Sequence, residues 1–158
     1  MSAKIGRINQ MNCNCLIIPG YGGSGDAHWQ TIWENEKPAL FTRVIQADWL
    51  NPNCQTWMEK LESSIAARED PASDIFPQSI IGFNKVPTQK FSFPSHLIAS
   101  DNDPYSKMEF SRACAVQWGS TFHVVNNGGH LNSESNLGDW EFGKAVLNKL
   151  VSVTENQR

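Results

Sequence analysis

The chain has 158 residues, of which 40% are hydrophobic and 18% charged; this is the make-up of one globular domain and excludes an intrinsically disordered chain. A net charge of −3 without a dense Lys/Arg cluster argues against a nucleic-acid-binding surface. No apolar run is long enough to span a bilayer and the polar segment 1–14 lacks a signal-peptide core, so we expect a cytoplasmic protein with no membrane partner.

The first half of the chain predicts strand, helix, strand and helix, in that order, over residues 16–18, 28–37, 43–47 and 53–67. Pro19 follows the first strand and Pro38 stops the first helix, because proline has no N–H for the backbone ladder. Trp57, Leu61 and Ile65 recur at helical spacing in the second helix.

Between residues 68 and 94 this alternation is lost. The segment contains Pro71, Pro77, Pro87 and Pro94 and shows neither a helix period nor a strand period. A join of this length without secondary structure is uncommon inside a compact domain. Strand, helix, strand and helix patterns then return over residues 95–100, 106–118, 121–125 and 140–153.

This order predicts an α/β protein: a three-layer, doubly wound parallel sheet with helices on both faces. We expect residues 1–12 to form a poorly ordered tail and residues 13–154 to form a single domain with the irregular join at 68–94.

Two predicted strands are followed directly by residues typical of acid–base chemistry. Asp101 and Asp103 come after the apolar run 97–99, and His130 comes after the run 122–125. Because the carboxyl ends of parallel strands meet at one edge of the sheet, we expect an acid and His130 to lie close together where open α/β folds bind ligands. Two thirds of a Ser-His-Asp triad are therefore present.

The remaining histidines are interpreted as structural. His28 is expected at the start of a helix, and His96 and His123 alternate within strands. A metal site built from His28, Asp48, Asp101, Asp103 and His130 is the rival interpretation, but no His-Glu-x-x-His or similar spacing supports it. We therefore expect neither a metal nor a cofactor.

Several motifs in order resemble one family over most of the chain, from about Leu16 to about Leu150. They are Pro19-Gly20-Tyr21-Gly22-Gly23-Ser24-Gly25 with His28-Trp29, Asp48-Trp49 and Trp57, Ala99-Ser100 through Asp103-Pro104-Tyr105, Gly129-His130-Leu131-Asn132, and Gly138-Asp139-Trp140. The chain resembles the small α/β-hydrolases of the retinoblastoma-binding protein 9 and YdeN type.

The resemblance implies a serine hydrolase, carboxylesterase-like, for small acyl substrates. It implies that Asp103, in the family's Asp-Pro-Tyr motif, is the acid and that His130 is the base. It further implies an oxyanion and substrate loop made of Gly20, Tyr21, Gly22, Gly23 and Ser24.

The nucleophile of this family departs from the pattern. Such hydrolases carry their serine on a Gly-x-Ser-x-Gly-like elbow between a central strand and a helix. Here that elbow is expected between Ala67 and Ile80, where Ser73 has no apolar strand before it and no glycine beside it. We therefore expect that a strand-elbow-helix-strand block of roughly 30 residues or more is absent, and the nucleophile is unknown.

Ser24 is the alternative nucleophile, because it follows a strand and precedes a helix. Asp26 stands where the last glycine of the elbow pattern belongs, so a turn role, with Ser24 or Asp26 capping the helix near His28, is the interpretation we favour.

Loss of the central block leaves about four strands in a truncated α/β-hydrolase fold. We predict the flavodoxin-like order 2-1-3-4, in which strand 16–18 pairs directly with strand 97–99. If the sheet does not close in this way, its exposed strand edges favour a homodimer.

Two classes of function follow. The first is a hydrolase of small acyl compounds with little or no activity, because a histidine without an adjacent nucleophile cannot form an acyl-enzyme. The second is a non-catalytic module that binds a ligand or a protein on the same scaffold.

Overall fold

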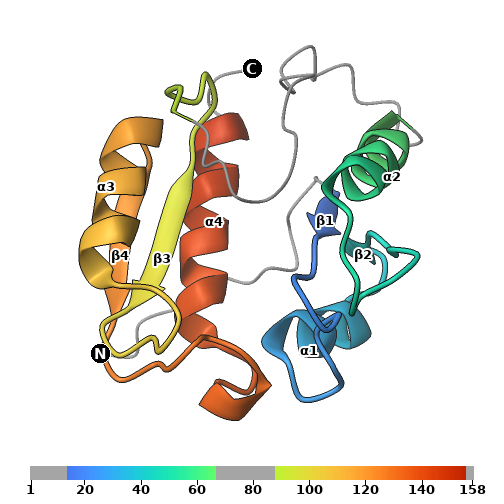
Figure 1. Cartoon of the computed structure of the whole chain (residues 1–158), viewed down its shortest axis with the longest axis horizontal. Helices are drawn as coiled ribbons and strands as arrows, with labels where there is room; N and C mark the ends of the chain where they lie inside the picture. The colour runs from blue at the N-terminus through green and yellow to red at the C-terminus, as the bar shows by residue number, and fades with distance from the viewer. Residues whose placement is uncertain (1–13, 67–87, 156–158) are drawn as a thin grey trace.

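The computed structural model describes residues 14–66 and 88–155 and has an α/β architecture (Figure 1). The predicted tail 1–12 and residues 68–87 of the predicted join lie outside the described residues, and residues 88–94 contain neither a helix nor a strand. The elements, in chain order, are β1 (Cys15–Ile17), α1 (Trp29–Glu36), β2 (Phe41–Arg43), α2 (Cys54–Ala66), β3 (His96–Ser100), α3 (Met108–Trp118), β4 (Thr121–Val125), the short 3-10 helix η2 (Ser133–Ser135) and α4 (Glu141–Glu155).

The described strands form two parallel pairs. In the first pair Cys15 lies opposite Phe41, and in the second His96 lies opposite Thr121. The parallel α/β class is confirmed, but the predicted order 2-1-3-4 is wrong at its centre, since β1 pairs with β2 and β3 with β4, and no β1–β3 ladder forms among the described residues.

The β3–β4 pair is the middle of three layers, with α3 on one side and α4 on the other (Figure 1). Paired residues of parallel strands point to the same face, so Leu97 shares a face with Phe122, and Ile98 shares the other with His123. Arg112 of α3 lies over the Phe122 ring, and Phe142 of α4 contacts the His123 ring. The prediction of helices on both faces is therefore confirmed for this pair.

Side chains, not a strand ladder, join the two pairs. The buried core cluster consists of Ile17, Trp33, Leu40, Phe41 and Trp140, and Ile98 of β3 packs against it. The indole of Trp29 donates to the Leu131 carbonyl at 2.9 Å, and that of Trp33 donates to the Asp139 carbonyl at 2.7 Å. Helix α1 thus connects the β1–β2 half to the segment between β4 and α4.

Strand β2 begins two residues earlier than predicted and is shorter. Its partner β1 ends at Ile17, and Pro19 cannot donate to a ladder, so β2 has no neighbour to extend along. The Val44 N–H still donates to the Ile17 carbonyl at 2.9 Å, and the Val44 side chain is buried. Of the branched run after Arg43, Val44 is therefore buried without a longer strand, whereas Ile45 is 57% exposed.

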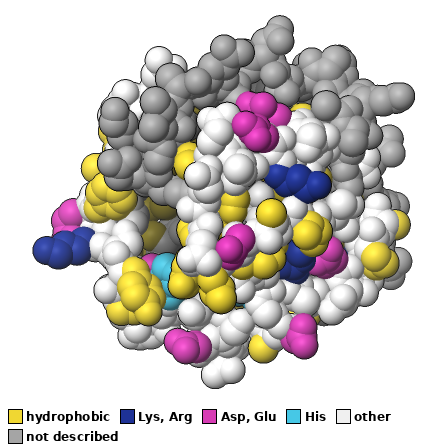
Figure 2. All heavy atoms as spheres, turned by 45° about the vertical axis from the view of Figure 1, so that its right-hand side comes forward, with side chains coloured by type: hydrophobic (Ala, Val, Ile, Leu, Met, Phe, Trp, Pro, Cys, Tyr) yellow, Lys and Arg dark blue, Asp and Glu magenta, His cyan; other side chains and the backbone are white. Residues whose placement is uncertain are grey.

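Within the described ranges, no helix combines the length and apolarity needed to cross a membrane. On the face shown in Figure 2, the acidic and basic side chains of the described residues lie in small separate groups, with hydrophobic side chains between them.

Candidate functional site

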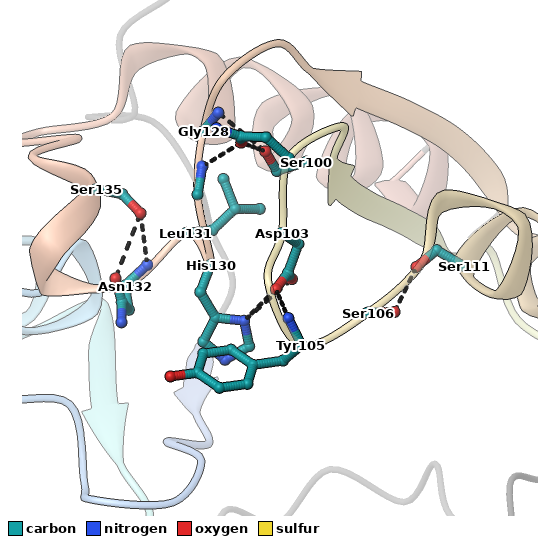
Figure 3. A network of polar contacts seen from close by, with 12 residues as sticks. Ser100, Asp103, Tyr105, Ser106, Ser111, Gly128, His130, Leu131, Asn132 and Ser135 are labelled. Carbon is teal, nitrogen blue, oxygen red and sulfur yellow. Dashed lines mark hydrogen bonds and ion pairs between the residues drawn. The ribbon is translucent and has the colours of Figure 1, made fainter.

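The loops that follow β3 and β4 bring a carboxylate and an imidazole together. Nδ1 of His130 lies 3.0 Å from both carboxylate oxygens of Asp103 (Figure 3). The Asp103 side chain is 15% exposed and that of His130 is 47% exposed, so the acid is the sheltered partner. The Tyr105 N–H also donates to Asp103 Oδ1 at 2.9 Å, which orients the carboxylate.

This geometry determines which nitrogen of His130 is available for chemistry. A carboxylate at Nδ1 holds the proton there, so the neutral ring presents Nε2 as a proton acceptor. The Tyr105 ring packs edge-on against the imidazole, with 4.7 Å between ring centroids. Among the described residues, no serine or cysteine is hydrogen-bonded to His130.

A set of hydrogen bonds holds the two loops in register. The Ser100 hydroxyl accepts from the Gly128 N–H at 2.9 Å and donates to Asn102 Oδ1 at 2.8 Å. That amide oxygen accepts from the Gly129 N–H at 2.7 Å, directly before His130. Asp101 accepts from the Asn127 N–H at 2.7 Å, so it bridges the loops and is not the partner of His130.

The sequence analysis missed Ser100 and Asn102 as positioning residues. A signal for them was present, because the short polar residues Ser100 and Asn102 lie at the end of β3 and just after it, and two glycines follow the neighbouring β4. Such side chains can accept from the backbone N–H groups of a glycine loop.

The predicted substrate loop has left-handed backbone at Gly22, Gly23 and Ser24, with φ of 79°, 77° and 52°. A Cβ at Gly23 would lie 3.0 Å from the Trp49 ring, which explains the glycine there. The Arg43 guanidinium fixes the loop backbone, because it donates to the Gly23 carbonyl at 3.1 Å and to the Ser24 carbonyl at 3.4 Å.

Most of this loop faces the same pocket as His130. The pocket has a volume of about 770 Å³. Its lining includes Gly20, Tyr21, Gly22, Ser24, His28, Tyr105, His130 and Glu134, whereas Gly23 is not part of it. The structure therefore brings Asp103, His130 and four of the five predicted loop residues to one site.

Ser24 lies in this pocket, but its hydroxyl is engaged elsewhere. Its Oγ donates to Gln30 Oε1 at 2.7 Å. It also does not cap α1, and neither does Asp26, so that part of our interpretation was wrong: the N-cap is His28, whose Nδ1 accepts from the Gln30 N–H at 3.2 Å. Burial lowers the pKa of His28, and electrostatic interactions with Arg43 and His130 lower it further.

The structure does not assemble the rival metal site. Asp48 accepts from the N–H groups of Leu50 and Asn51 at 2.9 and 3.0 Å, and so forms a turn. Within residues 14–66 and 88–155, no three His, Cys, Asp or Glu side chains are grouped to hold a metal ion. His96 and His123 contact each other between β3 and β4, away from the pocket, with ring nitrogens 2.8 Å apart.

Comparison with known proteins shows the family of the chain. The Serine hydrolase family profile matches residues 15–75 and 70–149 of the chain. The crystal structure of a YdeN-like hydrolase from Pectobacterium atrosepticum is similar, with a TM-score of 0.77 and 21% sequence identity over 89% of this chain and 92% of that chain. No curated protein matches. Because the profile covers most of the chain, the protein belongs to the serine hydrolase family.

Proposed function

We propose that this protein retains the acid–base pair and the acyl pocket of a serine hydrolase, and that it hydrolyses small esters slowly or not at all. The observation that carries the proposal is the Asp103–His130 pair facing a pocket in which the hydroxyl of Ser24, the alternative nucleophile, is bonded to Gln30. An imidazole without an adjacent nucleophile can at best act as a base on water.

The sequence supports the loss of the nucleophile. The family match consists of two segments that meet at residues 70–75, where the elbow is expected and where Ser73 lacks its glycines. We propose that the elbow segment is absent and that no other serine replaces it.

The second candidate is a binding protein that uses the same pocket without turnover. The aromatic side chains of Tyr21 and Tyr105 favour it, since they are 73% and 78% exposed and border a pocket of about 770 Å³. Exposed aromatic side chains beside a concave site are typical of ligand or partner contacts.

A fluorophosphonate probe and a p-nitrophenyl ester assay separate these functions. We expect no labelling and little or no turnover in protein that unfolds cooperatively, because among the described residues no serine or cysteine is hydrogen-bonded to His130. Ser24→Ala tests the alternative nucleophile, with Ser63→Ala as the control, since Ser63 is an exposed helix residue whose hydroxyl donates to the Lys60 carbonyl.

Labelling that disappears in Ser24→Ala and persists in Ser63→Ala would show that Ser24 is the nucleophile and that our proposal is wrong. Turnover without labelling that disappears in His130→Ala would identify His130 as a base on water. Complete absence of turnover together with ligand binding would favour the second function.

A further inference from the structure

His28 is a second imidazole in the pocket lining, and it belongs neither to the Asp103–His130 pair nor to the predicted substrate loop. It belongs to the N-terminal half of the chain, whereas His130 follows β4, yet both line the same pocket. The side chain of His28 is half-buried and its ring packs against Trp29, with 5.4 Å between ring centroids. The imidazole is therefore held in place and not free to turn.

The cap of α1 determines the tautomer of this ring. Nδ1 of His28 accepts the Gln30 N–H at 3.2 Å, and a nitrogen that accepts carries no proton. In the neutral ring the proton must then be on Nε2. Among the described residues, no group accepts a hydrogen bond from Nε2, so this donor is available to the pocket.

We propose that His28 is a ligand-binding residue whose Nε2–H donates a hydrogen bond to the carbonyl oxygen of a neutral acyl ligand, an ester or an amide. This assignment extends the proposed function, because it uses the same pocket and names the group that holds the acyl oxygen. Donors aimed at a carbonyl oxygen bind it in the ground state and favour the developing charge in any reaction.

The charges around the ring fit a neutral donor and a neutral ligand. Arg43 and His130 both oppose a positive charge on His28, and burial opposes it as well, so the pKa of His28 is lowered and the ring stays neutral at physiological pH. Glu134 also lines the pocket and disfavours a carboxylate ligand. Butyramide is therefore a suitable probe, with butyrate as its charged counterpart.

The test uses the full chain and nitrogen-15 NMR of the imidazoles. In free protein near neutral pH we expect His28 to show the Nε2–H tautomer, and we expect butyramide to shift the Nε2 resonance. His28→Asn keeps the cap, because its amide oxygen can accept from the Gln30 N–H, but it removes the donor. We expect unchanged thermal stability and butyramide binding about threefold to tenfold weaker.

His28→Gln is the complementary variant, since its longer amide can reach into the pocket while the cap is lost. We expect it to recover part of the binding and to lose stability. The proposal is overturned if His28 carries its proton on Nδ1, if butyramide leaves its resonances unchanged, if butyrate binds more tightly than butyramide, or if His28→Asn binds like the wild type. Ester turnover does not enter this test, so a failure here is distinct from a failure of the proposed function.

Discussion

At the end of β3 one hydroxyl group serves two hydrogen bonds. Ser100 is 2% exposed, and its Oγ both accepts from the Gly128 N–H and donates to Asn102. Because Gly128 and Gly129 directly precede His130, these contacts set the position of the imidazole relative to Asp103. The separation of 3.0 Å between acid and base thus depends on a serine whose hydroxyl bonds to Gly128 and Asn102 and not to the pair itself.

Removing this hydroxyl leaves a buried backbone N–H without its partner. We expect Ser100→Ala to reduce the free energy of unfolding by about 1–3 kcal/mol, the cost of an unsatisfied buried donor. Urea denaturation measures the change. Ser152→Ala is the control, because Ser152 is an exposed residue of α4, and we expect an effect within about 0.5 kcal/mol. Equal effects of the two substitutions would contradict the positioning role of Ser100.

At the scale of elements, β3 and β4 share a histidine pair on the face covered by α4. Nδ1 of His96 lies 2.8 Å from Nε2 of His123, so at least one of the two nitrogens must be unprotonated. Burial lowers the pKa of His96, and the charges of His123 and of Lys149 on α4 lower it further. Phe142 of α4 covers the His123 ring and adds no charge. Protonation of His96 therefore opposes the packing of α4, which carries Lys149.

The lowered pKa of His96 predicts that the free energy of unfolding decreases in acid. The pKa of His96 in the folded protein lies below its ordinary value of 6.5, so the folded state binds fewer protons than the unfolded state. The stabilisation is complete above 6.5 and is lost as the pH falls through the lowered folded pKa. Urea unfolding between about pH 7.5 and about pH 5 measures it.

In His96→Asn we expect a smaller decrease of unfolding free energy across the same pH interval. The remaining dependence should decrease again in His28→Asn, because the pKa of His28 is lowered in the same direction. An unchanged pH dependence in His96→Asn would show that folding does not change the protonation of His96.

At the scale of the whole molecule, α1 is the connection between the two strand pairs. Trp33 is 5% exposed, packs on Phe41 of β2 and on Trp140, and donates to the Asp139 carbonyl. Lys144 of α4, whose side chain is buried, adds an ion pair across the same boundary, with its Nζ 2.7 Å from the half-exposed Glu36. The two halves therefore share one core and should unfold together.

Trp33→Ala tests this shared core. We expect a loss of about 3–5 kcal/mol in the free energy of unfolding, because a large buried ring is removed and a cavity remains. Trp33→Phe keeps part of the ring contact and should lose less. Urea denaturation followed by near-ultraviolet and far-ultraviolet circular dichroism provides the measurement. Two separate transitions in the wild-type protein would contradict a single cooperative core.

Local patterns were sufficient to predict much of this protein. Strand β4 has the predicted bounds, and α3 ends at Trp118 as predicted, because Gly119 follows with left-handed backbone and caps the helix. The contact between Asp103 and His130 was predictable as well, since both follow strands that lie side by side. By contrast, the start of β2 was predicted too late, because the length of a strand depends on its partner as well as on its own residues.

The amino-acid sequence alone determined the order of helices and strands, the family and the candidate acid and base, since each is recorded in neighbouring residues or in motifs. Only the tertiary structure decided that the strands form two pairs, that Ser100 positions the His130 loop and that His28 reaches the same pocket. These features depend on contacts between distant segments, such as Trp29 with Leu131, 102 residues apart. Side-chain periodicity specifies which face of an element is buried, but it does not specify which distant element covers it.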